Sequence, residues 1–319
     1  MTEPEQKKLA ITHASGLLAE ALLDVMAASG FDPERVVLLD RAELAGNRLA
    51  FGSTYLDVQD QLAYDYEDLM AVLLLEPDSE LEDLLQHAEC HVISHHRDDP
   101  AQTFFNAQAK SARLPDEPSA IQLPSAQLST LLVVLQSIHQ HYALRNLNVV
   151  NVLSASFFGK AGVEELAGQT ISLLNSKSIK STVFPLQMAF NMFATESAID
   201  QEQQIVDALQ ADDVKCSVQE LVVPAFHGMA ISVSLETGQP MQLSSMAERL
   251  NTLPGVSVQD QIVSPVTHCS DSADIIINQL SQPQSDSNRL QFWIFADSVK
   301  NGLLQNYQNS IEILLKSFL

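Results

Sequence analysis

The densest group of potential metal ligands lies between positions 87 and 96. His87, Cys90, His91, His95 and His96 combine imidazoles with a thiol, a ligand set that suits zinc. The spacing instead favours a histidine-rich turn from a helix into a strand, because a strand beginning at His91 turns successive side chains to opposite faces. We therefore predict no metal site here.

A second candidate is the adjacent pair His268 and Cys269, in a Thr-His-Cys-Ser segment. Neighbouring residues seldom orient for proton transfer, since nucleophile and base usually come from separate segments that converge in space. Neither a Gly-x-Ser-x-Gly elbow nor a Gly-x-x-x-x-Gly-Lys-Ser/Thr loop is present. Local motifs alone thus indicate no catalytic group, and any site must be assembled by the fold.

The composition limits the classes of partner. A chain of 319 residues with 46% hydrophobic and 18% charged residues can bury the cores of two domains. Its net charge of −23 repels phosphate backbones and anionic lipid headgroups, so we expect neither nucleic acid nor membrane as a partner. Three scattered cysteines fit a reducing compartment, and no secretory or membrane-spanning apolar run is visible, so a cytoplasmic location is expected.

The pattern of apolar residues changes near the middle of the chain. Short apolar runs at 8–12, 36–39, 72–75, 91–94 and 120–123 alternate with helical spacing at 16–29 and 79–88, which predicts an α/β, Rossmann-like doubly wound parallel sheet. After a helix at 128–142, longer strands at 148–155, 216–225 and 229–235 indicate an antiparallel or mixed sheet in an α+β domain. We predict one domain from 1–124, completed by a C-terminal helix at 300–319, and a second from 125–299. Polar linkers are expected at 111–119 and 281–288.

The turn after the first strand is where a dinucleotide-binding domain carries glycines. Only Gly16 remains of that pattern, so an ordinary strand-to-helix turn is the alternative interpretation. Asp40, after the second strand, could accept a hydrogen bond from a ribose 2′-hydroxyl and would repel a 2′-phosphate, or it could be a solvated strand end. NAD is therefore easier to accommodate than NADP. The candidate coenzyme contacts are His13, Ser15, Gly16, Leu17 and Asp40.

Several segments, in order along the chain, resemble the aspartate-semialdehyde dehydrogenase family. They are 160–169 (KAGVEELAGQ), 187–192 (QMAFNM), Val223-Pro224 with Gly228, and Ala296-Asp297 with Gly302 and Asn306. The resemblance covers nearly the whole chain and extends to the Usg-type paralogues that bacteria carry beside the true dehydrogenase. It implies a semialdehyde dehydrogenase-like second domain that forms a homodimer through its sheet, NAD or NADP as coenzyme, and a link to amino-acid biosynthesis.

The resemblance also shows which reacting groups are missing. The family's cysteine nucleophile corresponds to Ala126, whose methyl group has no lone pair, and its histidine corresponds to Met229, a thioether without a titratable proton near neutral pH. His227 would be displaced by about 6 to 7 Å along a strand, which is too far to replace that histidine.

Three further positions also lack the residue that the family uses to bind substrate or coenzyme. Val222 stands where the family has a carboxylate-binding arginine, Ser156 replaces a glutamine, and Glu43 replaces a coenzyme-loop arginine. Three functions stay open on these grounds. The first is a non-catalytic homologue that acts by protein or ligand binding, the second an NAD(P)-dependent oxidoreductase that uses non-standard residues, and the third a partner in mixed dimers with an active paralogue.

Overall fold

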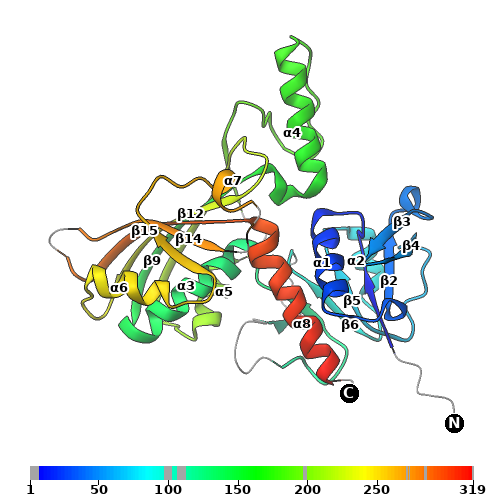
Figure 1. Cartoon of the computed structure of the whole chain (residues 1–319), viewed down its shortest axis with the longest axis horizontal. Coiled ribbons are helices and arrows are strands. Elements are labelled where there is room, and N and C mark those ends of the chain that lie inside the picture. Colours follow the sequence, from blue (N-terminus) through cyan, green and yellow to red (C-terminus); the bar gives the residue numbers. More distant parts are fainter. Residues whose placement is uncertain are drawn as a thin grey trace. The chain divides into compact units, whose positions relative to one another are not determined.

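The computed structural model describes residues 7–96, 103–105, 113–196, 200–270, 272, 274–283 and 286–317. The chain divides into two compact units (Figure 1). The first consists of Met1–Ser125 with Leu303–Leu319, and the second of Ala126–Gly302. Each unit has a sheet of its own. Across the described residues, no helix has the length and hydropathy to cross a membrane.

The first unit is built on an eight-stranded sheet in the order β3-β4-β2-β1-β5-β6-β8-β7. All neighbours are parallel except β3 and β4, which form an antiparallel hairpin at one edge. The central strands are buried on both faces, as expected for a parallel sheet covered by helices. The strands are β1 (Lys8–Ile11), β2 (Val36–Asp40), β3 (Arg48–Phe51), β4 (Thr54–Asp60), β5 (Leu69–Leu74), β6 (His91–Ser94), β7 (Thr103–Phe104) and β8 (Ala120–Gln122).

Three α-helices belong to this unit: α1 (Leu17–Ala28), α2 (Ser79–Leu85) and α8 (Leu304–Ser317). Helix α1 ends just before Gly30, whose φ of +76° suits a glycine, and the Asp78 carboxylate caps α2 through the amide of Leu81. Helix α8 buries Tyr307 and Leu314 on one face and contacts α1. A wide π-helical turn, Ser298–Leu303, precedes α8, so the α-helix begins later than the predicted 300.

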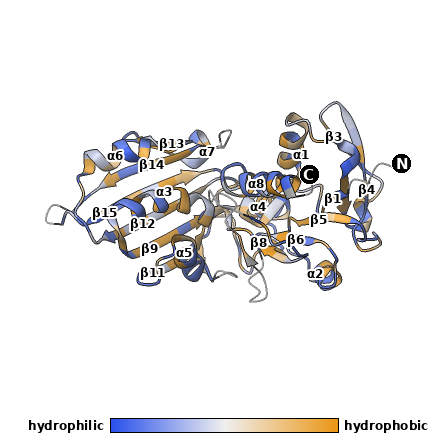
Figure 2. Cartoon of the chain, turned by 90° about the horizontal axis from the view of Figure 1, so that it is seen from below, coloured by the Kyte–Doolittle hydropathy of each residue, from blue (hydrophilic) through white to orange (hydrophobic). Residues whose placement is uncertain are grey.

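The second unit is built on a seven-stranded mixed sheet in the order β10-β11-β9-β12-β15-β14-β13. Strand β9 pairs parallel with β11 and antiparallel with β12, so the predicted mixed sheet is present. Hydrophobic residues run through the central strands of both units (Figure 2). The strands are β9 (Leu144–Leu153), β10 (Phe193–Thr195), β11 (Lys215–Val222), β12 (Met229–Thr237), β13 (Val256–Gln259), β14 (Ile275–Ser281) and β15 (Arg289–Ala296).

Three helices of the second unit lie on the same face of this sheet, namely α3 (Ala126–Tyr142), α5 (Gln201–Leu209) and α6 (Leu243–Asn251) (Figure 1). Helix α4 (Gly159–Leu174) follows a 3-10 turn at Ala155–Phe158, and the short α7 spans Pro265–His268. Strand β9 alternates between buried residues such as Leu147 and Val149 and residues of the other face such as Asn148 and Val150. One face of the sheet therefore packs under helices.

The predicted fold class is confirmed, but several elements differ from expectation. The predicted strand at 148–155 begins at Leu144 and ends at Leu153, because the chain enters the 3-10 turn at Ala155. The predicted helix at 128–142 begins at Ala126. Of the two predicted linkers, residues 111–112 and 284–285 lie outside the described part of the chain.

Candidate functional site

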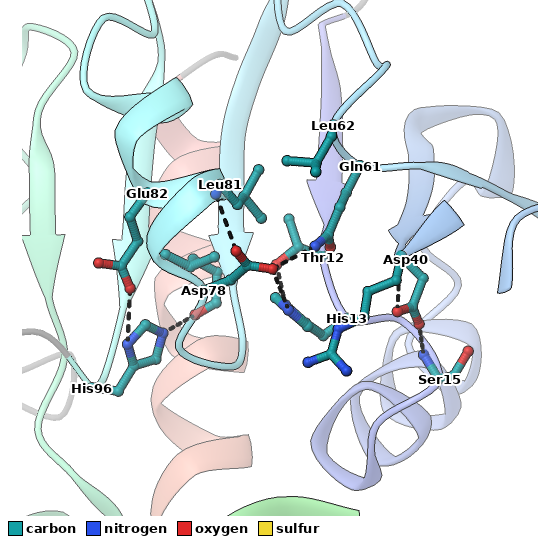
Figure 3. A network of polar contacts seen from close by, with 12 residues as sticks. Thr12, His13, Ser15, Asp40, Gln61, Leu62, Asp78, Leu81, Glu82 and His96 are labelled. Atoms are coloured by element: carbon teal, nitrogen blue, oxygen red, sulfur yellow. Dashed lines mark hydrogen bonds and ion pairs between the residues drawn. The ribbon is translucent and has the colours of Figure 1, made fainter. Parts of the chain in front are cut away.

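The turn between β1 and α1 is fastened by a carboxylate. Asp40, at the end of β2, is 3% exposed, and its Oδ2 accepts the Ser15 amide at 2.8 Å (Figure 3). Its Oδ1 accepts the Arg41 amide at 2.9 Å. Within the turn, the Gly16 amide donates to the His13 carbonyl at 2.9 Å. Asp40 is therefore not a solvated strand end, because both of its oxygens hold backbone amides.

A buried polar network continues from this turn toward α2 (Figure 3). His13 is 3% exposed, has a φ of +50°, and places Nδ1 3.2 Å from the Thr12 hydroxyl and Nε2 3.5 Å from Asp78 Oδ2. The same Asp78 oxygen accepts Nε2 of Gln61 at 2.8 Å. The network lies at the carboxyl ends of β1, β2 and β5, where open α/β sheets bind their ligands.

Gly16 is packed tightly at the start of α1. No side chain caps this helix, of which Leu17 is the first residue. A Cβ on Gly16 would lie 2.7 Å from Oε1 of Glu76 and 3.1 Å from the His13 carbonyl oxygen. The Glu76 carboxylate thus occupies the space beside the helix N-terminus. Glu76 has no local signal in the sequence, because it follows β5, far along the chain from the glycine that it approaches.

In the second unit, Ala126 is the first residue of α3 and is 1% exposed. A Cβ on Gly302 would lie 2.6 Å from the Ala126 carbonyl oxygen and 2.7 Å from its Cα, so the wide turn packs directly on this backbone. The Thr130 hydroxyl lies 2.9 Å from the same carbonyl oxygen and 3.0 Å from Oδ1 of Asn301. The backbone at Ala126 is therefore held by contacts from two segments, and its side chain presents only a methyl group.

Met229 and Val222 are core residues. Met229 begins β12, is 2% exposed, and stands opposite Leu153 of β9 and Ala296 of β15. Val222 ends β11, is fully buried, and packs in a cluster that includes Phe184. Neither side chain can carry a proton or a charge, so neither can act as a base or bind a carboxylate.

Ser156 belongs to a line of three buried serine hydroxyls. Its Oγ lies 3.0 Å from Oγ of Ser154 and 3.3 Å from Oγ of Ser298. The Ser156 amide donates to the Phe226 carbonyl at 2.9 Å, which fixes the turn beside the 223–228 segment. A neighbouring hydroxyl is too weak a base to take the proton from a serine, so these contacts do not activate Ser156 as a nucleophile.

His227 is exposed and lies in a bend ahead of β12, whose first residue is Met229. The strand geometry expected for His227 was wrong, because Gly228, with a φ of +84°, turns the chain before the strand begins. A Cβ on Gly228 would lie 2.6 Å from Cβ of Pro265, so only glycine fits this close approach.

The histidines that follow β6 form hydrogen bonds inside the first unit. Nδ1 of His95 lies 2.9 Å from the Tyr307 hydroxyl, which donates to the Leu74 carbonyl at 3.1 Å. Burial, followed by the nearby His96, holds the pKa of His95 well below its usual value. His96 lies 3.3 Å from the Leu74 carbonyl and 3.7 Å from Glu82. Among the described residues, no group of three or more His, Cys, Asp or Glu is arranged to hold a metal ion.

The pair His268 and Cys269 is not arranged for proton transfer. Nδ1 of His268 contacts the Ser264 amide at 3.2 Å and the Thr267 hydroxyl at 2.7 Å. Cys269 is fully buried, and burial, followed by the negative charge of nearby carboxylates, raises its pKa to about 11. A thiol with a raised pKa is the opposite of an activated nucleophile.

We expect all three thiols to resist alkylation. Burial raises the pKa of Cys90 to about 11 and that of Cys216 to about 12. With a pKa of 11, about one thiol in a thousand is ionised at pH 8, against about one in four for a free cysteine. Iodoacetamide at pH 8, followed by mass spectrometry, should label Cys90 and Cys269 about a hundredfold and Cys216 about a thousandfold more slowly than glutathione, while urea-unfolded protein reacts quickly. A thiol that reacts as fast as glutathione would reveal an activated cysteine.

Two motifs that carry the family resemblance meet in the structure. Oε1 of Gln169, in α4, accepts the amides of Met188 at 2.8 Å and Ala189 at 3.1 Å. Its Nε2 lies 3.2 Å from Oγ of Ser181 and 3.1 Å from Oε1 of Glu165. The segments at 160–169 and 187–192 therefore form one structural module.

Glu165 fastens the same module. Its Oε2 accepts the Thr182 amide at 2.7 Å, the Thr182 hydroxyl at 2.6 Å and the Val183 amide at 2.7 Å, and its Oε1 accepts the Phe184 amide at 3.3 Å. Burial by itself would raise the pKa of Glu165, but these hydrogen bonds together outweigh it and lower the pKa. The Glu165 carboxylate therefore holds the 182–184 segment against α4.

Comparison with known proteins identifies the family. A family model described as the semialdehyde dehydrogenase dimerisation domain matches residues 135–300, which is more than half of the chain. The chain belongs to the semialdehyde dehydrogenase family. The USG-1 protein homolog of Pseudomonas aeruginosa is 27% identical to it, over 98% of both chains. Aspartate-semialdehyde dehydrogenase of Legionella pneumophila is 24% identical, over 98% of this chain and 96% of its own.

Solved structures of the family agree with the fold. Aspartate semialdehyde dehydrogenase II from Vibrio cholerae, complexed with ASA, has a TM-score of 0.83 at 23% identity and covers 99% of this chain and 100% of its own. A probable aspartate-semialdehyde dehydrogenase from Pseudomonas aeruginosa also has a TM-score of 0.83, at 25% identity and the same coverage. The resemblance inferred from the motifs is confirmed.

In this semialdehyde dehydrogenase homologue, the segment 296–302 contacts three of the residues predicted from the sequence as site positions. Met229 pairs with Ala296, Ser156 contacts Ser298, and Ala126 packs against Gly302. The match of this segment to the family was visible in the sequence, but its contacts with these three residues were not predicted. The signal was the spacing of the small residues Ala296, Ser298 and Gly302, which permits close backbone packing.

Proposed function

We propose that this chain is a non-catalytic member of the semialdehyde dehydrogenase family, which acts as a homodimer by binding protein or ligand. Ala126 is the single observation that carries the proposal. The thiol route begins when a sulfur lone pair forms a bond to the aldehyde carbon, and it continues when hydride leaves that carbon. A methyl group has no electron pair to start this sequence, and the buried thioether of Met229 cannot accept the proton.

The environment of Ala126 supports this proposal. Gly302 packs on the Ala126 backbone, and Thr130 contacts its carbonyl oxygen, so the register of this helix start is fixed by contacts on two sides. The three cysteines of the chain, Cys90, Cys216 and Cys269, occupy other sequence positions, and burial raises the pKa of each. Raised pKa values argue against any of these thiols as a replacement nucleophile.

The test is a steady-state assay of the pure full-length protein with aspartate semialdehyde, phosphate and either NADP or NAD. Aspartate-semialdehyde dehydrogenase of Legionella pneumophila serves as the positive control. We expect coenzyme reduction at the rate of the protein-free blank. Reduction that scales with protein concentration, and that persists after a further purification step, would refute the proposal and favour an oxidoreductase with non-standard residues.

The homodimer proposal rests on an open face of the second sheet. Figure 1 shows α3, α5 and α6 gathered on one face of this sheet. The other face carries partly exposed apolar side chains on adjacent central strands. Ser232 of β12 pairs with Val150 of β9 on one side and with Trp293 of β15 on the other, so these three residues lie side by side on this face. The rings of Trp293 and Phe295 stack with centroids 6.2 Å apart. This partly exposed sheet face consists of Val150, Val152, Leu221 and Trp293, and Phe295 at its edge packs against Val263, Cys269 and Ile276.

Replacing Trp293 by glutamate should weaken the dimer. A charge at the centre of an apolar interface remains desolvated without a partner, so we expect the dimer dissociation constant to rise about a hundredfold. Sedimentation equilibrium measures it. Tyr55→Glu, which alters an exposed aromatic of the first unit, is the matched control and should leave the constant unchanged. A Trp293→Glu protein that dimerises like the wild type would show that the interface lies elsewhere.

A further inference from the structure

The coenzyme of a two-domain dehydrogenase fold would place its pyrophosphate at the N-terminus of the first helix, against glycines and free backbone amides. In this chain the corresponding place is the start of α1, at Gly16. Whether the residues there fit a dinucleotide depends on the amides that remain free, on the space beside the glycine, and on the charge of the groups that fill it.

Two amides of the turn, those of Ser15 and Gly16, already have acceptors, although no side chain caps the first turn of α1. The Ser15 amide donates to Asp40 Oδ2 at 2.8 Å, and the Gly16 amide donates to the His13 carbonyl at 2.9 Å. Asp40 would be the acid for a ribose hydroxyl, but its second oxygen holds the Arg41 amide at 2.9 Å. A dinucleotide could therefore use the Ser15 and Gly16 amides only by displacing their present acceptors.

The space beside the glycine is filled by negative charge. Oε1 of Glu76 lies 2.7 Å from the position of a Cβ on Gly16, which is the place where a phosphate would approach the backbone. A second carboxylate, Asp78, lies 3.5 Å from the His13 imidazole. This imidazole fills space in the turn that would be empty if residue 13 were a glycine. Like charges at such distances oppose a pyrophosphate, and the full charge of the chain, −23, adds to this effect.

We infer that this family member has lost its dinucleotide site, and that Glu76 and His13 are the groups that close it. In the first unit, the Glu76 carboxylate then lies beside the start of α1, at the place where a coenzyme phosphate would otherwise lie. This unit has a structural role only. This inference goes beyond the proposed function, since an absent nucleophile at Ala126 says nothing about whether a coenzyme binds.

The experiment is isothermal titration of the full-length protein with NADP and with NAD, each up to about 5 mM, at moderate salt. We expect no saturable binding by the wild type. The double variant His13→Gly, Glu76→Gln removes the imidazole and one negative charge. Its dissociation constant for at least one coenzyme should be about tenfold or more below the highest value that the titration can detect. His13→Gly is compatible with the local backbone, because its φ of +50° favours glycine.

Two controls keep the outcomes distinct. Glu80→Gln removes the same charge from an exposed position in α2 and should leave binding undetectable. Glu76→Gln alone serves if the double variant fails to fold, and it should give weak but measurable binding. Saturable binding of either coenzyme by the wild type would overturn the inference while leaving the proposal about Ala126 intact. Folded variants that still bind nothing would show that Glu76 and His13 do not close the site.

Discussion

Replacing Gly302 by alanine should lower the free energy of unfolding by about 3 kcal/mol. The new Cβ would meet the backbone of Ala126, at 2.6 Å from its carbonyl oxygen and 2.7 Å from its Cα. Backbone atoms cannot rotate away as the end of a side chain can, so either the wide turn before α8 or the start of α3 has to move. Urea unfolding followed by circular dichroism measures the change.

Gly168 offers a matched control for this substitution. It lies in α4, and a Cβ there would meet nothing within 4 Å. Alanine at an open helical position stabilises by about 0.5 to 1 kcal/mol, so Gly168→Ala and Gly302→Ala should shift the free energy of unfolding in opposite directions. Equal and small effects of the two substitutions would mean that 296–302 does not pack on the start of α3 as described.

Replacing Glu165 by alanine should lower the free energy of unfolding by about 2 to 3 kcal/mol at pH 7. The carboxylate accepts hydrogen bonds from three consecutive amides and from the Thr182 hydroxyl, all of which lose this partner in the variant. Urea unfolding of the variant and the wild type gives the difference. Glu164→Ala, at an exposed neighbouring position, should change stability by less than about 0.5 kcal/mol.

The effect of Glu165 should also depend on pH with a defined sign. Its folded-state pKa lies below its ordinary value of 4.5, so the carboxylate stabilises the fold fully above about pH 4.5. That stabilisation is lost as the pH falls through the folded-state pKa. The difference between the wild type and Glu165→Ala should therefore be constant from pH 6 to pH 7 and shrink below about pH 4. A difference that grows on acidification would contradict the hydrogen-bonded arrangement.

The sequence predicts the first unit best where its strands are apolar on both faces. Strands β1, β2 and β6 match the predicted runs closely, because a buried parallel strand is continuous in hydrophobicity, whereas β5 begins three residues before its predicted run at 72–75. The hairpin of β3 and β4 was missed, since its exposed residues give it no such run. Strand β15 was also missed, although Leu290, Phe292 and Ile294 alternate with polar or partly exposed residues in a way that indicates a half-buried strand.

The candidate site was less predictable than the fold. Ala126, Met229, Val222 and Ser156 could be found by resemblance because each occupies a position in a motif. Contacts between distant segments could not, and neither the approach of Glu76 to Gly16 nor that of Gly302 to Ala126 has a local signal. Asp40 was recognised as a candidate, but its hydrogen bonds to the amides of Ser15 and Arg41 were not predicted.

A single-turnover experiment tests the absence of catalysis most directly. Protein in excess over aspartate semialdehyde is mixed with phosphate and with NADP at about 5 mM, so that even one slow reaction per chain accumulates a reduced coenzyme. With a methyl group at Ala126, we predict no formation of NADPH above the protein-free control over several hours. Formation of NADPH in proportion to the aldehyde added would show that another group of this chain performs the chemistry, and it would contradict the account.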